Sequence, residues 1–132
     1  MKILLVDDDE MFRGLASKTL AKASYQVTVA SNGEEAIKKA GGEDDFDLLI
    51  TDMFMPNKDG MAVIQRIKAL RPSIKIIVVS SSGAAEYTSF KIAETLGANG
   101  SLQKPFTPAQ LLEKVREVTV DEEKKRQPRT AN

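Results

Sequence analysis

The chain contains no cysteine and no histidine. Without cysteine, disulfides, thiolate nucleophiles and thiolate zinc sites are excluded. Without histidine, the chain lacks the most common general base and the most common ligand of transition metals. Any metal ion that this protein holds must therefore have oxygen ligands, which favours magnesium, calcium or manganese.

Neither an excess of charge nor a long hydrophobic run is present. Lys plus Arg and Asp plus Glu are equal, 19 each, so no overall field attracts nucleic acid. The apolar run at the N-terminus covers only Ile3–Val6 before three aspartates, which is too short for a signal peptide or a membrane span. We expect a cytoplasmic chain that binds neither nucleic acid nor a membrane directly.

The size and composition are those of a single globular domain. With 132 residues, 42% hydrophobic and 29% charged, the chain can bury about two-thirds of the surface that its unfolded form exposes. The last segment, DEEKKRQPRTAN, has no apolar residue except Ala131. We therefore expect one folded domain over residues 1–120 and a charged, disordered tail over residues 121–132.

Short apolar runs alternate with stretches of helical periodicity along the whole domain. The predicted strands are Lys2–Val6, Gln26–Ala30, Asp47–Thr51, Ile74–Val79 and about Asn99–Gln103. The predicted helices are Glu10–Ala23, a short one after the cap Asn32, Met61–Leu70, Ala84–Leu96 before the cap Gly97, and one after the capping box of Thr107 and Gln110. Met53–Gly60 is expected to be a loop. Apolar strands with helical crossovers predict an α/β fold, a parallel sheet covered on both faces.

Charged and hydroxyl side chains follow several of these strands. Ligands of open parallel sheets bind at the carboxyl ends of the strands. The residues at those ends are Asp7, Asp8 and Asp9 after the first strand, Asp52 after the third, Ser80–Ser82 after the fourth and Lys104 after the fifth. Alone, each has an ordinary explanation as a helix cap, a turn residue or a surface lysine. Their convergence on one edge of the sheet is a much stronger signal of function.

Such a cluster of acids requires a cation. Two carboxylates about 4 Å apart repel by roughly 4 kcal/mol at an effective dielectric near 20, and each raises the pKa of the other unless a positive charge intervenes. Magnesium or the ammonium of Lys104 can supply that charge. A carboxylate beside both cations is also a competent nucleophile toward a phosphoryl group.

The residues resemble a known family along about Lys2–Val118. The matching segments are ILLVDDD at Ile3–Asp9, DLLITDMFMPNKDG at Asp47–Gly60, IIVVSSS at Ile76–Ser82 and KPF at Lys104–Phe106. They resemble the receiver domain of two-component response regulators, the CheY-like group. The resemblance implies a doubly wound, flavodoxin-like parallel sheet of five strands in the order 2-1-3-4-5, with five helices.

The resemblance also implies a role for each site residue. Asp52 is expected to accept a phosphoryl group from a histidine kinase or a phosphotransfer protein. Magnesium is expected to be bound by Asp8 directly, by Asp7 through water, by Asp52 and by the backbone carbonyl of Phe54. The chain would then catalyse only its own phosphorylation and dephosphorylation, and would not otherwise be an enzyme.

The signalling residues follow from the same resemblance. Ser80 is the expected switch hydroxyl, and Lys104 is expected to pair with the phosphoryl oxygens. The peptide bond from Lys104 to Pro105 is expected to be cis. A downstream effector protein is expected to bind the face formed by the fourth helix, the fifth strand and the fifth helix.

The sequence departs from the family pattern at several positions. Ser101 stands where many receiver domains carry an aromatic residue, so the signal is expected to pass through the backbone of Gly83–Tyr87. The interval between Ser80 and Lys104 is slightly long for the family, and we place the extra length within residues 83–90. Phe54 and Ser82 occupy positions that tune attack by water. Because Phe54 cannot orient a water molecule, a long-lived acyl phosphate is expected.

Two other functional classes remain open from the sequence. A phosphatase of the haloacid-dehalogenase type also uses a D-x-D motif, which Asp7 and Asp9 would supply, but it needs acids on a strand after the lysine. Here the first acid after Lys104 is Glu113, within a predicted helix. A degenerate receiver that only binds proteins is disfavoured because the acids, the hydroxyl and the lysine are all retained.

Overall fold

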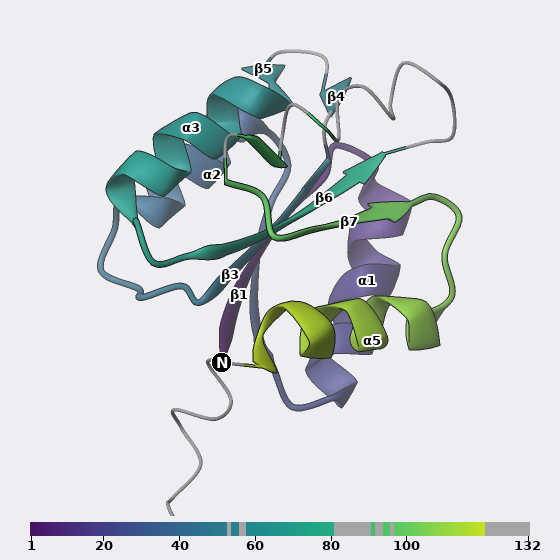
Figure 1. Ribbon diagram of the computed structural model, residues 1–132. Coiled ribbons are helices and arrows are strands. Elements are labelled where there is room, and N and C mark those ends of the chain that lie inside the picture. The colour runs from purple at the N-terminus through teal and green to yellow at the C-terminus, as the bar shows by residue number, and fades with distance from the viewer. Residues whose placement is uncertain (53, 56–57, 81–90, 92–93, 96, 121–132) are drawn as a thin grey trace, which may run out of the picture.

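The computed structural model describes residues 1–52, 54–55, 58–80, 91, 94–95 and 97–120 (Figure 1). Its elements are β1 (Lys2–Val6), α1 (Glu10–Lys22), β2 (Gln26–Ala30), α2 (Gly33–Ala40), β3 (Leu48–Asp52), β4 (Phe54–Met55), β5 (Lys58–Asp59), α3 (Gly60–Leu70), β6 (Lys75–Ser80), β7 (Gly100–Gln103) and α5 (Pro108–Val118). The predicted tail, residues 121–132, lies outside the described residues. Among the helices that are described, none combines the length and the apolar character needed to cross a lipid bilayer.

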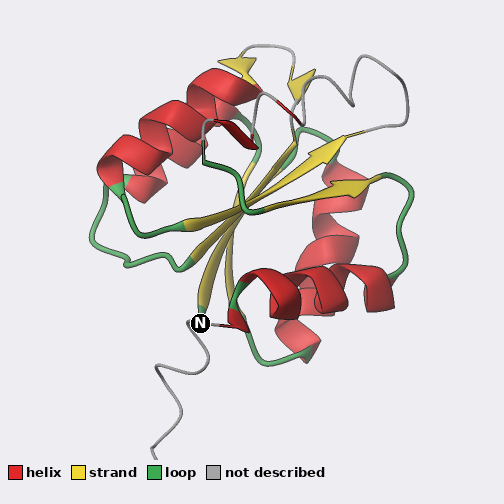
Figure 2. Ribbon diagram, viewed as in Figure 1, coloured by secondary structure: helices red, strands yellow, loops and turns green. Residues whose placement is uncertain are grey.

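The central sheet has five parallel strands in the order β2-β1-β3-β6-β7. Because β4 and β5 form a separate small pair, β6 and β7 are the fourth and fifth strands of this sheet, and the predicted order 2-1-3-4-5 is confirmed. Figure 2 shows the strands fanning through the middle of the molecule between two layers of helices. The doubly wound α/β fold predicted from the alternating pattern is therefore present.

The two faces of the sheet are covered by different helices because side chains alternate along each strand. Leu4 and Val6 of β1 pack with α2 and α3 in one hydrophobic cluster. Ile3 and Leu5 pack with α1 and α5 in the other. All four of these residues are buried, so β1 is a central strand that has no polar face.

Most helix ends follow the predicted chemistry. Asp9 is the N-cap of α1, and its carboxylate accepts hydrogen bonds from the backbone of Met11 and Phe12. Thr107 and Gln110 form the predicted capping box of α5, with Pro108 in its first turn.

The predicted helix Ala84–Leu96 lies mostly outside the described residues. Lys91, Glu94 and Thr95 are helical. Gly97 follows with φ +112°, in the left-handed region expected of a C-terminal cap, and its N–H donates to the carbonyl of Glu94.

Some predicted boundaries were wrong by one residue. β3 begins at Leu48, because Asp47 instead uses its carboxylate and its N–H to bond the backbone of Lys2. At the other end of β3, Asp52 is the last residue of the strand rather than the first residue after it.

The segment predicted as the loop Met53–Gly60 includes regular secondary structure. It contains the antiparallel pair β4 and β5, and α3 already begins at Gly60. The C-terminal ends of two helices lie away from the sheet. Leu70 is the last residue of α3 and 42% exposed, and Ala23 is the exposed C-cap of α1, so neither lies over the sheet.

Candidate functional site

Three carboxylates meet at the carboxyl end of the sheet. Asp7 and Asp8 follow β1, and Asp52 ends the neighbouring β3, whose Thr51 lies opposite Val6. One oxygen from each carboxylate lies within 4.8 Å of the others. The structure thus brings together the acids that were predicted to converge, and it does so through the register of two adjacent parallel strands.

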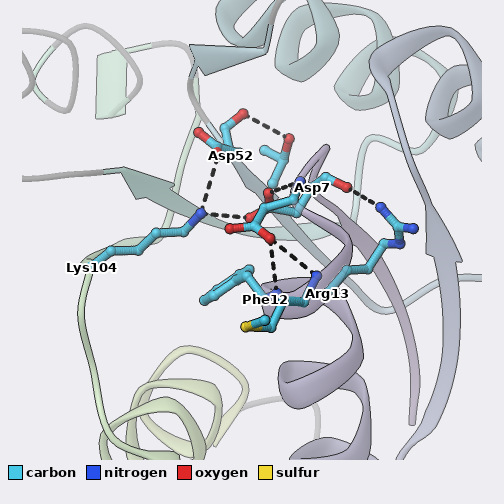
Figure 3. A network of polar contacts seen from close by, with 8 residues as sticks. Asp7, Phe12, Arg13, Asp52 and Lys104 are labelled. Carbon is cyan, nitrogen blue, oxygen red and sulfur yellow. Dashed lines mark hydrogen bonds and ion pairs between the residues drawn. The ribbon is translucent and has the colours of Figure 1, made fainter.

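Lys104, which directly follows β7, extends its side chain to the cluster (Figure 3). Its Nζ lies 2.8 Å from Oδ2 of Asp7 and 3.3 Å from Oδ2 of Asp52. The other oxygen of Asp7 accepts a hydrogen bond from the backbone N–H of Asp9, at 2.9 Å. The ammonium therefore bridges two of the three carboxylates, which reduces their mutual repulsion.

The three acids differ in their access to solvent. Asp7 is 1% exposed and Asp52 is 8% exposed, whereas Asp8 is exposed. Asp7 is therefore held inside by its hydrogen bonds, and Asp8 presents its carboxylate to ions from solution.

The environment of Lys104 keeps it charged. Burial by itself lowers the pKa of this ammonium, but the hydrogen bond and the charge of Asp7, followed by the charge of Asp52, raise it by more. The net pKa is above the ordinary lysine value. A permanent positive charge is therefore present beside Asp52 at neutral pH.

The donor set of the cluster fits a hard divalent cation. All three ligand atoms are carboxylate oxygens, the type that magnesium, calcium and manganese prefer. Two oxygens on opposite sides of one magnesium ion are separated by about 4.2 Å. The limit of 4.8 Å between the oxygens of the cluster is close to that value, so these residues could hold a metal ion after a small adjustment or with one contact through water.

For the other predicted site residues, the structure describes the backbone of some and none of the rest. Ser80 is the last residue of β6 and pairs in register with Gln103, the residue before Lys104. Phe54 lies in β4, two positions after Asp52. The side chains of Ser80 and Phe54 lie outside what the structure describes, as do residues 81–90 with Ser82 and the predicted relay Gly83–Tyr87. The peptide bond between Lys104 and Pro105 is cis, as predicted.

Sequence reasoning missed three residues that surround the cluster. The Phe12 ring lies under Lys104, with its centroid 4.0 Å from Nζ. Phe106 packs edge-on against that ring, with centroids 5.4 Å apart and an interplanar angle of 87°. Arg13 donates from Nη1 to the backbone carbonyl of Asp7, at 2.7 Å. Phe12 was predicted only to lie within the helix Glu10–Ala23. The sequence signal that could have identified Phe12 as a site residue was its position in the first turn of the helix that follows the aspartates.

The position of Asp9 argues against the haloacid-dehalogenase alternative. That chemistry would need Asp7 and Asp9 to act together in the site. Asp9 is exposed, and its Oδ1 accepts from Met11 and Phe12 at 3.1 and 3.3 Å. Its carboxylate therefore serves the N-terminus of α1, and it is not part of the cluster of Asp7, Asp8 and Asp52.

Comparison with curated proteins finds relatives among transcriptional regulators. The chain is 32% identical over 117 residues to the alkaline phosphatase synthesis transcriptional regulatory protein PhoP of Bacillus subtilis, which covers 89% of this chain and 48% of PhoP. It is 34% identical to the transcriptional regulatory protein CpxR of Escherichia coli, with the same two coverages. The chain thus spans about half the length of these relatives.

Solved structures and a family model also match most of this chain. The chemotaxis protein CheY4 of Vibrio cholerae has a TM-score of 0.80 at 32% identity, over 89% of this chain and 97% of that one. A CheY-like receiver domain protein of Methanospirillum hungatei has a TM-score of 0.83 at 31% identity, over 94% and 97%. Residues 3–116 match the response regulator receiver domain. The chain therefore belongs to the response regulator receiver domain family, the phosphorylation-activated switches of two-component signal transduction.

Proposed function

We propose that Asp52 accepts a phosphoryl group from the phosphohistidine of a histidine kinase or a phosphotransfer protein. The observation that carries this proposal is the contact of Lys104 with Asp52 and Asp7 in a site that still leaves Asp52 8% exposed. A carboxylate that is accessible, oriented and next to a fixed positive charge has what a nucleophile toward a phosphoryl group requires. The chain catalyses its own phosphorylation and dephosphorylation and no other reaction.

In the transfer, a carboxylate oxygen of Asp52 attacks phosphorus and forms an acyl phosphate, while the P–N bond to the histidine breaks. The electron pair of that bond goes to the imidazole nitrogen, which then takes a proton. Lys104 faces the negative charge that spreads over the three equatorial oxygens. A magnesium ion held by Asp7, Asp8, Asp52 and the carbonyl of Phe54 would stabilise the same charge when bound.

The new phosphoryl group changes the contacts of Lys104. In the unmodified chain the ammonium is shared between Asp7, at 2.8 Å, and Asp52, at 3.3 Å. A phosphoryl group carries more negative charge than the carboxylate that it replaces, so it competes for the ammonium. Ser80, at the end of the adjacent β6, is the hydroxyl that we assign as the second contact of the phosphoryl group.

The proposed output is a downstream effector protein that binds the face of β7 and α5. A groove of about 500 Å³ runs along this face, lined by residues of β7, of the following turn and of α5. Lys104 directly follows β7, so a change in its contacts acts on the end of that strand. Ser101 lies in β7 opposite Val78, and we propose that the signal is carried by the backbone because serine offers no ring to rotate.

Acetyl phosphate tests the proposal without a cognate kinase. The purified chain, incubated with this donor and magnesium, is expected to gain one hydroxylamine-sensitive phosphoryl group, and a chelator is expected to prevent the gain. Mass spectrometry would measure the uptake and locate the group. Steady release of phosphate from a generic phosphate ester would instead indicate a phosphatase, and no uptake would indicate a binding module.

Replacing Asp8 with asparagine is expected to have opposite effects on stability and on metal binding. In the absence of metal, loss of one charge from the cluster should raise the free energy of unfolding by about 1 kcal/mol, the repulsion of two charges 4 Å apart in water. Magnesium binding should be lost, because a direct ligand is gone. Urea unfolding and magnesium titration measure the two effects.

The matched control for that variant is Glu10→Gln. Glu10 is an exposed acid in the first turn of α1 and is not part of the cluster. Its replacement should not stabilise the fold, because an acid is already favourable at a helix N-terminus. If Asp8→Asn were equally or less stable than the natural chain, repulsion within the cluster would not be significant.

The lifetime of the acyl phosphate is expected to depend on residue 54. A phenyl ring cannot orient a water molecule for attack on phosphorus, whereas an asparagine amide can. Phe54→Asn should therefore shorten the half-life of the labelled chain by up to about 100-fold, the order of effect that the placement of a reactant can have. Decay of the label after removal of the donor is the measurement. Phe54→Leu, which also lacks a hydrogen-bonding group, should decay like the natural chain.

A further inference from the structure

Lys104 has a third partner besides the two carboxylates. Its Nζ lies 4.0 Å from the centroid of the Phe12 ring, well within the distance of about 6 Å at which a ring face attracts a cation. Figure 3 shows the ring on the α1 side of the ammonium, with Asp52 on the opposite side. The lysine side chain is only 21% exposed, so this attraction acts in a partly desolvated place, where cation–π contacts are strongest.

Phe12 has contacts at both its ring and its backbone. Phe106 packs against it edge to face, at 5.4 Å and 87°, the geometry that aromatic pairs prefer. The backbone N–H of Phe12 donates to the N-cap carboxylate of Asp9, at 3.3 Å. Both rings pack against the hydrophobic cluster beneath α1 and α5. Phe12 therefore has packing contacts of its own, which do not depend on Lys104.

The contact of Lys104 with the ring differs from its contacts with the carboxylates because it does not depend on whether Asp52 carries a phosphoryl group. A lysine side chain is flexible, and its ammonium is a compact charge without a preferred plane. Its contacts with Asp7 and Asp52 change when Asp52 carries a phosphoryl group, because the new oxygens compete for the same N–H donors. The ring face accepts no strong hydrogen bond and keeps its charge distribution in both states, so its attraction persists through the transfer.

We propose that Phe12 is a positioning residue for phosphoryl transfer, which holds the ammonium of Lys104 above the site by a cation–π contact while Phe106 holds the ring. The inference rests on the proposed function, because it assigns Lys104 to the charge on the transferring group. It adds a residue of α1 to a site otherwise formed at the ends of the strands.

The test compares three variants under saturating magnesium and acetyl phosphate. Phe12→Leu removes the ring and should slow phosphorylation by about fivefold, within the range of a partly desolvated cation–π contact. Phe12→Tyr keeps a ring face and should restore most of the rate. Phe46→Leu is the matched control, because Phe46 is 5% exposed in the hydrophobic cluster on the other face of the sheet. It should lose stability and keep its rate.

Two further readouts separate positioning from a general loosening of the site. The magnesium concentration that gives half of the maximal rate should be unchanged in Phe12→Leu, because no metal ligand is altered. In the natural chain, the ring current of Phe12 should shift the Cε protons of Lys104 upfield in the NMR spectrum. This shift should disappear in Phe12→Leu and remain in Phe12→Tyr. Both readouts distinguish a missing ring from a disordered acidic cluster.

The outcomes are distinct. Equal rates for the natural chain and Phe12→Leu, no rescue by Phe12→Tyr, or an equal loss in Phe46→Leu would overturn the inference and leave the proposed function intact. A natural chain that takes no phosphoryl group at all would overturn the proposed function and this inference together. A slow Phe12→Leu, a rescued Phe12→Tyr and an unaffected Phe46→Leu are the results that the geometry predicts.

Discussion

Asp52→Asn is expected to abolish uptake of a phosphoryl group from acetyl phosphate. An amide lacks the charge of a carboxylate and is not a nucleophile toward phosphorus under these conditions. The substitution keeps the shape of the side chain and an oxygen that Lys104 can still contact, so the fold should persist. In the absence of metal, the variant should be at least as stable as the natural chain, because one of three crowded charges is gone. Intact-mass measurement after incubation with donor and magnesium records the result.

The control for this variant is an aspartate outside the cluster. Asp45 is highly exposed, with a side-chain exposure of 91%, and pairs with Arg71 at 3.1 Å. Asp45→Asn should be labelled as the natural chain is, because its carboxylate has no part in the site. Retained labelling of Asp52→Asn would move the acceptor to another side chain, and mapping of the modified residue would identify it.

Among the proposed variants, Lys104→Ala is expected to cause the largest decrease in the free energy of unfolding. It leaves the carboxylate of Asp7, 1% exposed, without its ammonium partner and next to Asp52. Breaking a buried ion pair on one side costs about 3–5 kcal/mol, and we expect the lower end because Lys104 is 21% exposed. Urea unfolding in the absence of metal measures the loss. Magnesium should restore part of it, because a bound cation neutralises the same carboxylates.

Two variants make this prediction specific. Lys104→Arg keeps the positive charge and should lose much less stability than the alanine variant. Lys114→Ala removes a lysine of α5 that pairs with the exposed Glu117 at 3.3 Å, and should cost less than about 1 kcal/mol, as surface pairs do. If Lys104→Ala and Lys114→Ala lost the same amount, Asp7 would not depend on Lys104 for its neutralisation.

The sequence by itself determined the architecture and the place of the site. Apolar runs and helical periodicity depend on local residue types, so the strands of the sheet and the caps Asp9 and Thr107 could be predicted. The convergence of Asp7, Asp52 and Lys104 followed because parallel strands present their carboxyl ends at one edge. No knowledge of side-chain packing was needed for these conclusions.

Only the tertiary structure decided how each member of the site is used. Asp7 and Asp8 are neighbours of identical chemistry, yet Asp7 is buried in contact with Lys104 and Asp8 is exposed, and no local pattern of residues distinguishes the two. The contact between Phe12 and Lys104 joins α1 to the turn after β7. It depends on how α1 is rotated against the sheet, and that rotation results from the packing of the whole core rather than from any local pattern of residues.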